Sequence, residues 1–310
     1  MNRVMNSIVN TAKPILLAVA CTMLSVAALA AEPKGDLALA SVSAVAVDLD
    51  SGEILIAKHP DAPLSIASIT KLMTAMVVLD SGEGLDEWLR IKPWDEPLAK
   101  NAFSRIRLQS KARRKDLLRV ALMSSENRAA FNVAANHPGG AKAFIEAMNV
   151  KADQLGMHDS TFVDPTGLSP DNRSTAADLA RMVAAAHGYE LIGEYSTTRQ
   201  HTVRFQGPRY KLGYGNTNPL TGSFRWDVSL QKTGYLTEAG RCLVMVTRAG
   251  DTDVAMVMLN SFGKRSPLGD AGRMRRWLES GTVSRVAGAA KDYERRMVAS
   301  FGLASPPGGE

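Results

Sequence analysis

The chain has 310 residues, of which 45% are apolar and 22% are charged, and its formal net charge is +6. This composition is close to that of an average globular protein and excludes a disordered polypeptide, a collagen-like fibre and a disulfide-stapled miniprotein. Only two cysteines occur, Cys21 and Cys242, and neither lies near a second cysteine or a histidine at metal-ligand spacing, which argues against zinc-ribbon and redox-pair sites.

The first 30 residues have the pattern of a secretory signal peptide. Arg3 and Lys13 are its only charged residues, an apolar run extends from Pro14 to Ala31, and Ala28-Leu29-Ala30 offers the small residues that a signal peptidase accepts. An uncleaved anchor is the alternative, because a run of this length barely spans a bilayer. We expect cleavage after residue 30, a periplasmic protein, and no stable membrane anchor once the leader is removed.

Alternating apolar residues predict a hairpin after the leader. Its strands run from Val42 to Leu49 and from Glu53 to Ala57, with a turn at Asp50-Ser51-Gly52. From Ser65, which is a candidate N-cap, the apolar period becomes helical and continues to about Ser81-Gly82.

The middle of the chain has mainly helical patterns. The stretch 82–112 is polar and is typical of loop with a short strand, and helices are predicted over about 115–136, 141–155 and 176–186. Turn residues dominate the loop 156–174 between the last two helices.

Strand patterns return in the last third of the chain, over 228–236, 242–248 and 254–259, before a final helix over 269–279 with Met274 and Trp277 on its apolar side. Cys242 is predicted to be a buried strand residue and not a reactive thiol. Strands at both ends with helices between them imply an α/β fold of the α+β kind, in which one sheet is completed across an inserted helical region. We assign 31–300 to a single domain, with a sheet part at about 31–81 and 205–300, a helical insert at about 82–204, and a disordered tail at 301–310.

Ser68-Ile69-Thr70-Lys71 lies at the start of the first predicted helix. Positions three apart are neighbours on a helix, so the hydroxyl of Ser68 and the amine of Lys71 can meet. Burial and the positive end of the helix dipole both favour a neutral amine, which could take the serine proton. Taken alone, the pattern is more often a helix cap followed by a solvated lysine.

Two further segments bear on that interpretation. Ser125-Glu126-Asn127 interrupts an apolar helical face, although such a polar pair is often merely exposed. Lys232-Thr233-Gly234 lies on a predicted strand, where glycine lets a substrate backbone approach and the other two side chains can bind a carboxylate or an acyl amide. An edge-strand lysine beside a turn is the alternative. In this order the three segments are far more specific together than any one of them.

The three motifs form the set found in class A β-lactamases and penicillin-binding proteins. From about Val42 to Leu259 the chain resembles the low-molecular-mass penicillin-binding proteins, the D-alanyl-D-alanine carboxypeptidase and endopeptidase family of serine peptidases. Further matching stretches are Thr161–Leu168, Ser174–Leu179, Asn216–Leu220 and Ala239–Leu243. The resemblance implies a β-lactamase/transpeptidase-like fold, an antiparallel sheet flanked by helices with an inserted all-helical subdomain.

The resemblance also implies residue roles. Ser68 is expected to be the acylated nucleophile and Lys71 its base. Ser125 and Asn127 are expected to relay protons and hold the substrate. Glu126 departs from the plainest family pattern, in which a small glycine is usual, and we expect its side chain to point away from the pocket.

The third motif is expected to bind the substrate. Lys232 and Thr233 would take its carboxylate end beside Gly234, and the backbone N–H groups of Ser68 and Tyr235 would form the oxyanion hole. The charge of Lys232 is expected to depress the pKa of the nearby lysine base further.

Two features of the sequence distinguish between the enzyme classes that carry these motifs. A class A β-lactamase uses a glutamate-positioned water for deacylation, whereas the loop 156–174 offers Asp159, Asp164 and Asp171 but no glutamate. We therefore expect β-lactams to be covalent inhibitors. Only about 75 residues follow Gly234, and this short form resembles the endopeptidases that cut cross-links between peptidoglycan stem peptides. The alternatives are a carboxypeptidase that trims terminal D-alanine and a slow-turnover penicillin-binding sensor.

Other classes of partner are disfavoured. The basic run Lys111-Ala-Arg-Arg-Lys115 is interpreted as a solvated face, because a secreted chain with 6% aromatic residues is a poor candidate for nucleic-acid binding. The five histidines are dispersed without ligand spacing, so we expect no metal site and no cofactor.

Overall fold

The computed structural model describes residues 36–94 and 103–304. These residues belong to one unit of the chain, residues 34–310. The predicted leader at 1–30 and the tail from 305 onward lie outside the described ranges. Leu303, which the prediction included in the tail, donates its backbone N–H to the carbonyl of Val298 over 3.0 Å.

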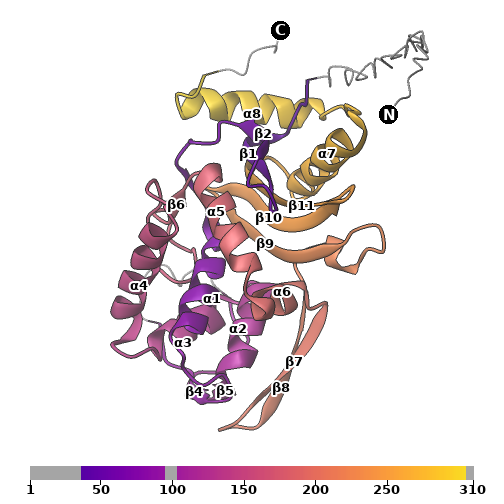
Figure 1. Cartoon of the computed structure of the whole chain (residues 1–310). Coiled ribbons are helices and arrows are strands. Elements are labelled where there is room, and N and C mark those ends of the chain that lie inside the picture. Colours follow the sequence, from indigo (N-terminus) through magenta and orange to yellow (C-terminus); the bar gives the residue numbers. More distant parts are fainter. Residues whose placement is uncertain (1–35, 95–102, 305–310) are drawn as a thin grey trace, which may run out of the picture. The chain divides into compact units, whose positions relative to one another are not determined.

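A five-stranded antiparallel sheet forms with the order β2-β1-β11-β10-β9 (Figure 1). The strands are β1 (Ser41–Asp48), β2 (Ile54–Lys58), β9 (Val228–Leu236), β10 (Gly240–Ala249) and β11 (Thr252–Ser261). Ser41 is paired with Ser261, so the first strand of the described chain completes a sheet whose other strands come from its far end. The predicted hairpin of β1 with β2 and the sheet completed from both ends are confirmed.

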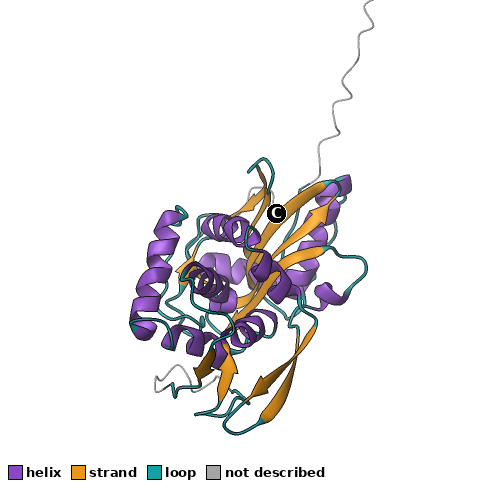
Figure 2. Ribbon diagram, turned by 60° about the horizontal axis from the view of Figure 1, so that its bottom comes forward, coloured by secondary structure: helices purple, strands orange, loops and turns teal. Residues whose placement is uncertain are grey.

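Alternation along the strands supplies a core on each face of the sheet. Val45 and Val257 belong to one buried cluster, whereas their neighbours Ala44 and Met258 belong to another, as the two-residue period of a strand requires. α5 (Ala176–His187) packs on the first face and α7 (Ser266–Ser280), through Met274, on the second (Figure 2). α8 (Gly288–Ser300) lies against β1 and β11.

The helical part of the chain packs against β9, at the edge of the sheet. It contains the short helix η1 and the helices α1 to α4 and α6, at Ala67–Thr70, Lys71–Asp80, Arg114–Met123, Asn127–Ala135, Gly140–Gln154 and Glu190–Thr197. Short strand pairs accompany them: β3 (Leu64–Ser65) with β6 (Arg173–Ser174), and β4 (Trp88–Arg90) with β5 (Lys111–Arg113).

The single helix predicted over 115–136 is wrong, because the chain forms α2 and α3 instead. The break lies at Ser125, whose φ of +60° is left-handed and cannot continue a right-handed helix. The side chain of Glu126 then caps α3 by accepting the backbone N–H of Arg128. The polar interruption in the apolar pattern is therefore a true break in the backbone.

No element was predicted where α6, the hairpin of β7 (Gln200–Phe205) with β8 (Tyr210–Gly215), and α8 lie. α8 has few large apolar residues, and its contact with the sheet includes an ion pair of 2.9 Å between Glu294 and Lys58. The hairpin extends away from the five-stranded sheet (Figure 1).

Two local predictions are corrected. Ser65 is not a helix cap: it lies in β3, and η1 begins after Ile66 without a side-chain cap. The run 111–115 is not a solvated face throughout, because Arg114 is fully buried and its guanidinium pairs with Glu83 at 2.9 Å and Glu87 at 2.5 Å.

Two further observations concern chemistry and compartment. Cys242 is buried in β10, as predicted, and burial raises the pKa of its thiol to about 12. Among residues 36–94 and 103–304, no helix is long and apolar enough to cross a membrane.

Candidate active site

The turn that carries Ser68 is held between two backbones. Ala67, just before it, has a φ of +48°, and Gly167 lies so close that a Cβ there would stand 2.0 Å from the carbonyl oxygen of Ala67. On the other side, a Cβ at Gly234 would stand 3.3 Å from the backbone nitrogen of Ser68. Both glycines are therefore needed for the loop and the strand to close on the serine turn.

Lys71 is fully buried and its Nζ atom has three partners. These are Ser68 Oγ at 2.8 Å, Asn127 Oδ1 at 2.7 Å and the carbonyl oxygen of Thr166 at 2.5 Å. The amide and backbone oxygens can only accept hydrogen bonds. A neutral amine satisfies both with its two N–H groups and turns its lone pair toward the hydroxyl of Ser68.

Burial lowers the pKa of Lys71 to about 7, and the charges of Asp164 and Glu126 oppose this shift. Removing an ammonium from water penalises its charged form, which is the physical cause. Near neutral pH a large fraction of Lys71 is therefore a free amine, the protonation state that a general base needs.

Asp164 fixes the loop that supplies the third partner of Lys71. Its buried carboxylate accepts the backbone N–H of Thr166 at 2.6 Å, Gly167 at 2.9 Å and Ser169 at 2.9 Å, and also the Thr166 hydroxyl at 2.5 Å. This set of bonds holds the carbonyl of Thr166 against Lys71. Sequence reasoning assigned no role to either residue, although Asp164-Pro165-Thr166-Gly167 is a recognisable turn signal.

Lys232 forms a second polar pair, with Ser125. Its Nζ atom lies 3.0 Å from Ser125 Oγ and 2.7 Å from the carbonyl oxygen of Thr233. The pKa of Lys232 is lowered well below the ordinary value, first by burial and then by the charge of Lys71. The left-handed backbone of Ser125 turns its hydroxyl toward β9 at this point.

One electrostatic expectation is corrected here. Lys232 was expected to lower the pKa of Lys71, but the shift of Lys71 comes from burial, and the repulsion between the amines appears at Lys232. Burial penalises the charged form of both amines, and their mutual repulsion is a property of the pair, which here lowers the pKa of Lys232.

Thr233 and Tyr235 extend the site along β9. The Thr233 hydroxyl lies 2.7 Å from that of Thr217, whose backbone N–H donates to the carbonyl of Met123 at the end of α2 over 2.9 Å. Thr217 thus ties the edge of β9 to the helix end next to Ser125, a role that sequence reasoning did not assign. Tyr235 follows Gly234 directly, and the guanidinium of Arg241 covers its ring at 3.6 Å from the centroid.

Glu126 stands between Ser125 and Asn127 in the second motif, and its side chain makes hydrogen bonds of its own. Its carboxylate accepts from the backbone of Arg128 at 3.1 Å, and burial raises its pKa. It turns back onto the start of α3, yet its charge still reaches Lys71.

The structure thus gathers the three motifs at one place, between η1, the α2–α3 break and β9. Lys71 contacts Ser68 at 2.8 Å and Asn127 at 2.7 Å, and Lys232 contacts Ser125 at 3.0 Å. Such a set can open an amide by attack of the serine on its carbonyl, with the proton passing to the amine.

Comparison with known proteins agrees with this chemistry. Residues 27–263 match the family model described as D-alanyl-D-alanine carboxypeptidase. A D-alanyl-D-alanine endopeptidase of Pseudomonas aeruginosa is 48% identical over 268 residues, which is 86% of each chain.

Solved structures share the fold. The Streptomyces K15 DD-transpeptidase has a TM-score of 0.72 at 26% identity, covering 84% of this chain and 99% of its own. Penicillin-binding protein D2 of Listeria monocytogenes, in its cefotaxime-bound form, has a TM-score of 0.68 at 27% identity, covering 79% and 99%.

Proposed function

Because the chain belongs to the D-alanyl-D-alanine carboxypeptidase family and is a serine DD-peptidase, we propose that it is an endopeptidase that cuts D-alanyl cross-links between peptidoglycan stem peptides. It does so through an acyl-enzyme on Ser68. The observation that carries the proposal is the position of the Lys71 amine. Of its three hydrogen-bond partners in the described residues, the hydroxyl of Ser68 is the one that can donate a proton.

In this mechanism Ser68 attacks the carbonyl of D-alanine as its proton passes to Lys71. The backbone N–H groups of Ser68 and Tyr235 stabilise the oxyanion, beside Gly234. Ser125, in contact with Lys232, gives its hydroxyl proton to the departing amine and regains one from the Lys71 ammonium, which becomes a free amine again, while Asn127 holds the acyl amide. Water then attacks the ester as its proton passes to Lys71, and Lys71 returns that proton to the oxygen of Ser68 as the ester bond breaks.

Three observations support cleavage of cross-links over removal of terminal D-alanine. The similarity to the Pseudomonas endopeptidase runs over 86% of both chains. Thr233, which would meet a terminal carboxylate, faces Thr217, a second neutral side chain. The pKa of Lys232 is also depressed, so the full positive charge that would favour a small terminal carboxylate is weakened there.

The experiment compares two purified substrates, a cross-linked muropeptide dimer and an uncross-linked pentapeptide monomer, with products identified by chromatography and mass. We expect the dimer to be converted to monomers faster than the monomer loses D-alanine. Faster trimming of the monomer would instead indicate a carboxypeptidase. Stable penicillin labelling with no conversion of either substrate would indicate a sensor.

The same site is proposed to bind β-lactams covalently. Asp164 uses its carboxylate to hold its own loop, while Asp159 and Asp171 are exposed, so none of the three is expected to position a deacylating water. Penicillin should therefore acylate Ser68 and remain there. We also propose that the protein acts in the periplasm, on the strength of the leader pattern in residues 1–30.

A further inference from the structure

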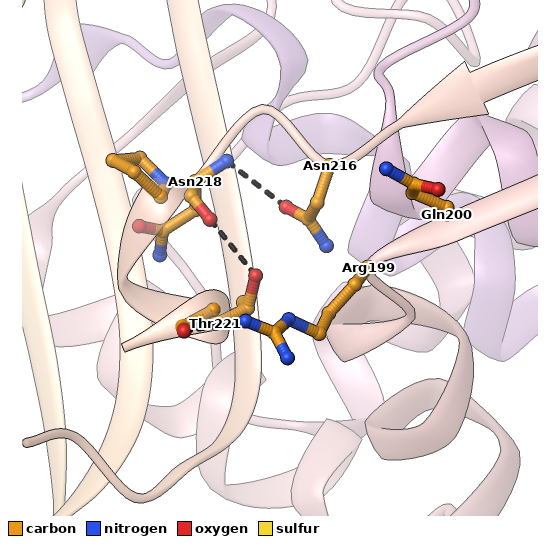
Figure 3. A pocket seen from close by; sticks show the side chains of 7 residues that line it. Arg199, Gln200, Asn216, Asn218 and Thr221 are labelled. Atoms are coloured by element: carbon orange, nitrogen blue, oxygen red, sulfur yellow. Dashed lines mark hydrogen bonds between the residues drawn. The ribbon is translucent and has the colours of Figure 1, made fainter. Parts of the chain in front are cut away.

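A cavity lies beside the segment that carries Thr217. It has a volume of about 650 Å³ and is lined by Arg199, Gln200, the residues on either side of Thr217, and the turn 219–222 (Figure 3). A volume of this size is typical of a ligand pocket. None of the residues that line it takes part in the acylation chemistry described above.

Arg199 is the charged residue of this cavity. Its guanidinium lies beside Thr221 (Figure 3), donates to the carbonyl of Gly222 at 2.5 Å, and would stand 2.9 Å from a Cβ at that glycine. Within the described ranges no carboxylate lies at ion-pair distance from it. The guanidinium has five N–H donors in a fixed fork, so most remain available to an anionic ligand.

Three consecutive residues border both the cavity and the proposed site. Thr217 touches Thr233 with its side chain, while Asn216 and Asn218 on either side of it line the cavity. Asn216 is itself fixed, because its side-chain amide donates to the carbonyls of Ser196 and Thr198 at 2.8 and 2.9 Å. This wall of the cavity is therefore built from the same rigid segment that borders the catalytic residues.

We propose that this cavity is the subsite for the departing stem peptide of a cross-link, and that Arg199 binds a carboxylate of that peptide. The inference rests on the proposed endopeptidase function. Thr233 lies on the side of the site where the departing group leaves. A single D-alanine ends there, but the second stem peptide of a cross-link is longer and must extend beyond Thr233, where Thr217 touches this residue and its neighbours Asn216 and Asn218 line the cavity.

The chemistry of the departing group fits the cavity. Cleavage releases an amine that belongs to a second peptide, and that peptide carries at least its terminal carboxylate. An arginine without an acidic partner recognises a carboxylate through paired, charge-assisted hydrogen bonds. A carboxypeptidase substrate does not extend this far, so Arg199 is a determinant of specificity and takes no part in acylation.

The test uses a synthetic cross-linked dimer in two forms, with the carboxylates of the departing peptide free or converted to amides. We expect the wild type to cleave the free acid with a kcat/KM roughly tenfold or more above that of the amide, as a charge-assisted pair predicts. In Arg199→Gln this preference should disappear, chiefly through a higher KM for the acid. The rate of penicillin acylation and the melting temperature should match the wild type.

Arg209→Gln is the matched control, because Arg209 is exposed in the turn at the other end of the β7–β8 hairpin. It should keep the preference for the acid. Equal cleavage of acid and amide by the wild type, or a preference that survives in Arg199→Gln, overturns the subsite while leaving the endopeptidase function intact. If the wild type cleaves neither dimer, the proposed function and the subsite both fail.

Discussion

The Nζ atom of Lys71 lies 2.8 Å from Oγ of Ser68, and its other two partners, Asn127 Oδ1 and the Thr166 carbonyl, can only accept hydrogen bonds. Among these three partners, the hydroxyl of Ser68 is the one from which a neutral Lys71 amine can take a proton. The arrangement gives the buried lysine the position of a base for Ser68.

Replacing Lys71 by alanine should therefore slow acylation of the protein by penicillin by a factor on the order of 10³ or more, as for other groups that act as a unit with their nucleophile. The measurement is the second-order rate constant for labelling by a fluorescent penicillin, with circular dichroism to establish folding. An unchanged rate in a folded variant would place the base elsewhere.

The pH dependence of acylation should follow the amine of Lys71, whose pKa is about 7. Only the neutral form accepts the serine proton, so the rate should fall about tenfold per pH unit below this pKa and level off above it. A rate that is constant from mildly acidic to mildly alkaline pH would contradict the assignment.

The lowered pKa of Lys71 also affects the stability of the fold. Lys71 has a lower pKa in the folded protein than the ordinary lysine value of 10.5, so between about pH 7 and 10.5 the unfolded chain binds more protons. The contribution of Lys71 to the free energy of unfolding should rise with pH across that window. Below pH 7 its unfavourable contribution is fully present. Denaturant titrations of the wild type and Lys71→Met at several pH values would measure this difference.

Gly234→Ala should impair acylation by about 100-fold, the size expected when a reacting group is displaced by about 1 Å. The added Cβ would stand 3.1 Å from the carbonyl oxygen of Ile66 and 3.3 Å from the nitrogen of Ser68, so the serine turn must move away from β9. Gly213→Ala is the matched control, because nothing lies within 4 Å of a Cβ there. Equal acylation rates in the two variants would show that the close approach is unimportant.

Asp164→Ala should destabilise the fold by about 3 kcal/mol or more and slow acylation as well, because it leaves several buried donors without an acceptor. The affected donors are the N–H groups of Thr166, Gly167 and Ser169. Asp171→Ala, an exposed position in the same loop, should change neither property. The readouts are the denaturant midpoint and the penicillin labelling rate, and a stable, fully active Asp164→Ala would refute the positioning role.

Periodicity predicted the strands and most helices because their side chains face a core at regular intervals, as Val45 and Val257 do. It also placed Ser68 beside Lys71, since three residues along a helix is a local distance. The break at Ser125 was missed because a left-handed residue other than glycine leaves little trace in an apolar pattern. Likewise, α8 was missed because its contacts with the sheet are small and partly ionic.

Parts of the site that depend on backbone atoms could not be predicted in this way. Every residue type has a backbone carbonyl, so only the folded loop shows that the carbonyl of Thr166 faces Lys71. Likewise Arg199 is an ordinary exposed arginine in the sequence, and its place in a cavity beside Thr217 depends on how the segment 216–222 folds back on it.

The most direct measurement is mass mapping of the penicillin-labelled protein, carried out in parallel on the wild type and Ser68→Ala together with hydrolysis of the cross-linked dimer. We predict one penicilloyl group on the peptide that contains Ser68 in the wild type. The variant should show neither a label nor dimer cleavage, with an unchanged melting temperature. A label on another residue, or a folded Ser68→Ala that still opens the dimer, would contradict the central role of this serine.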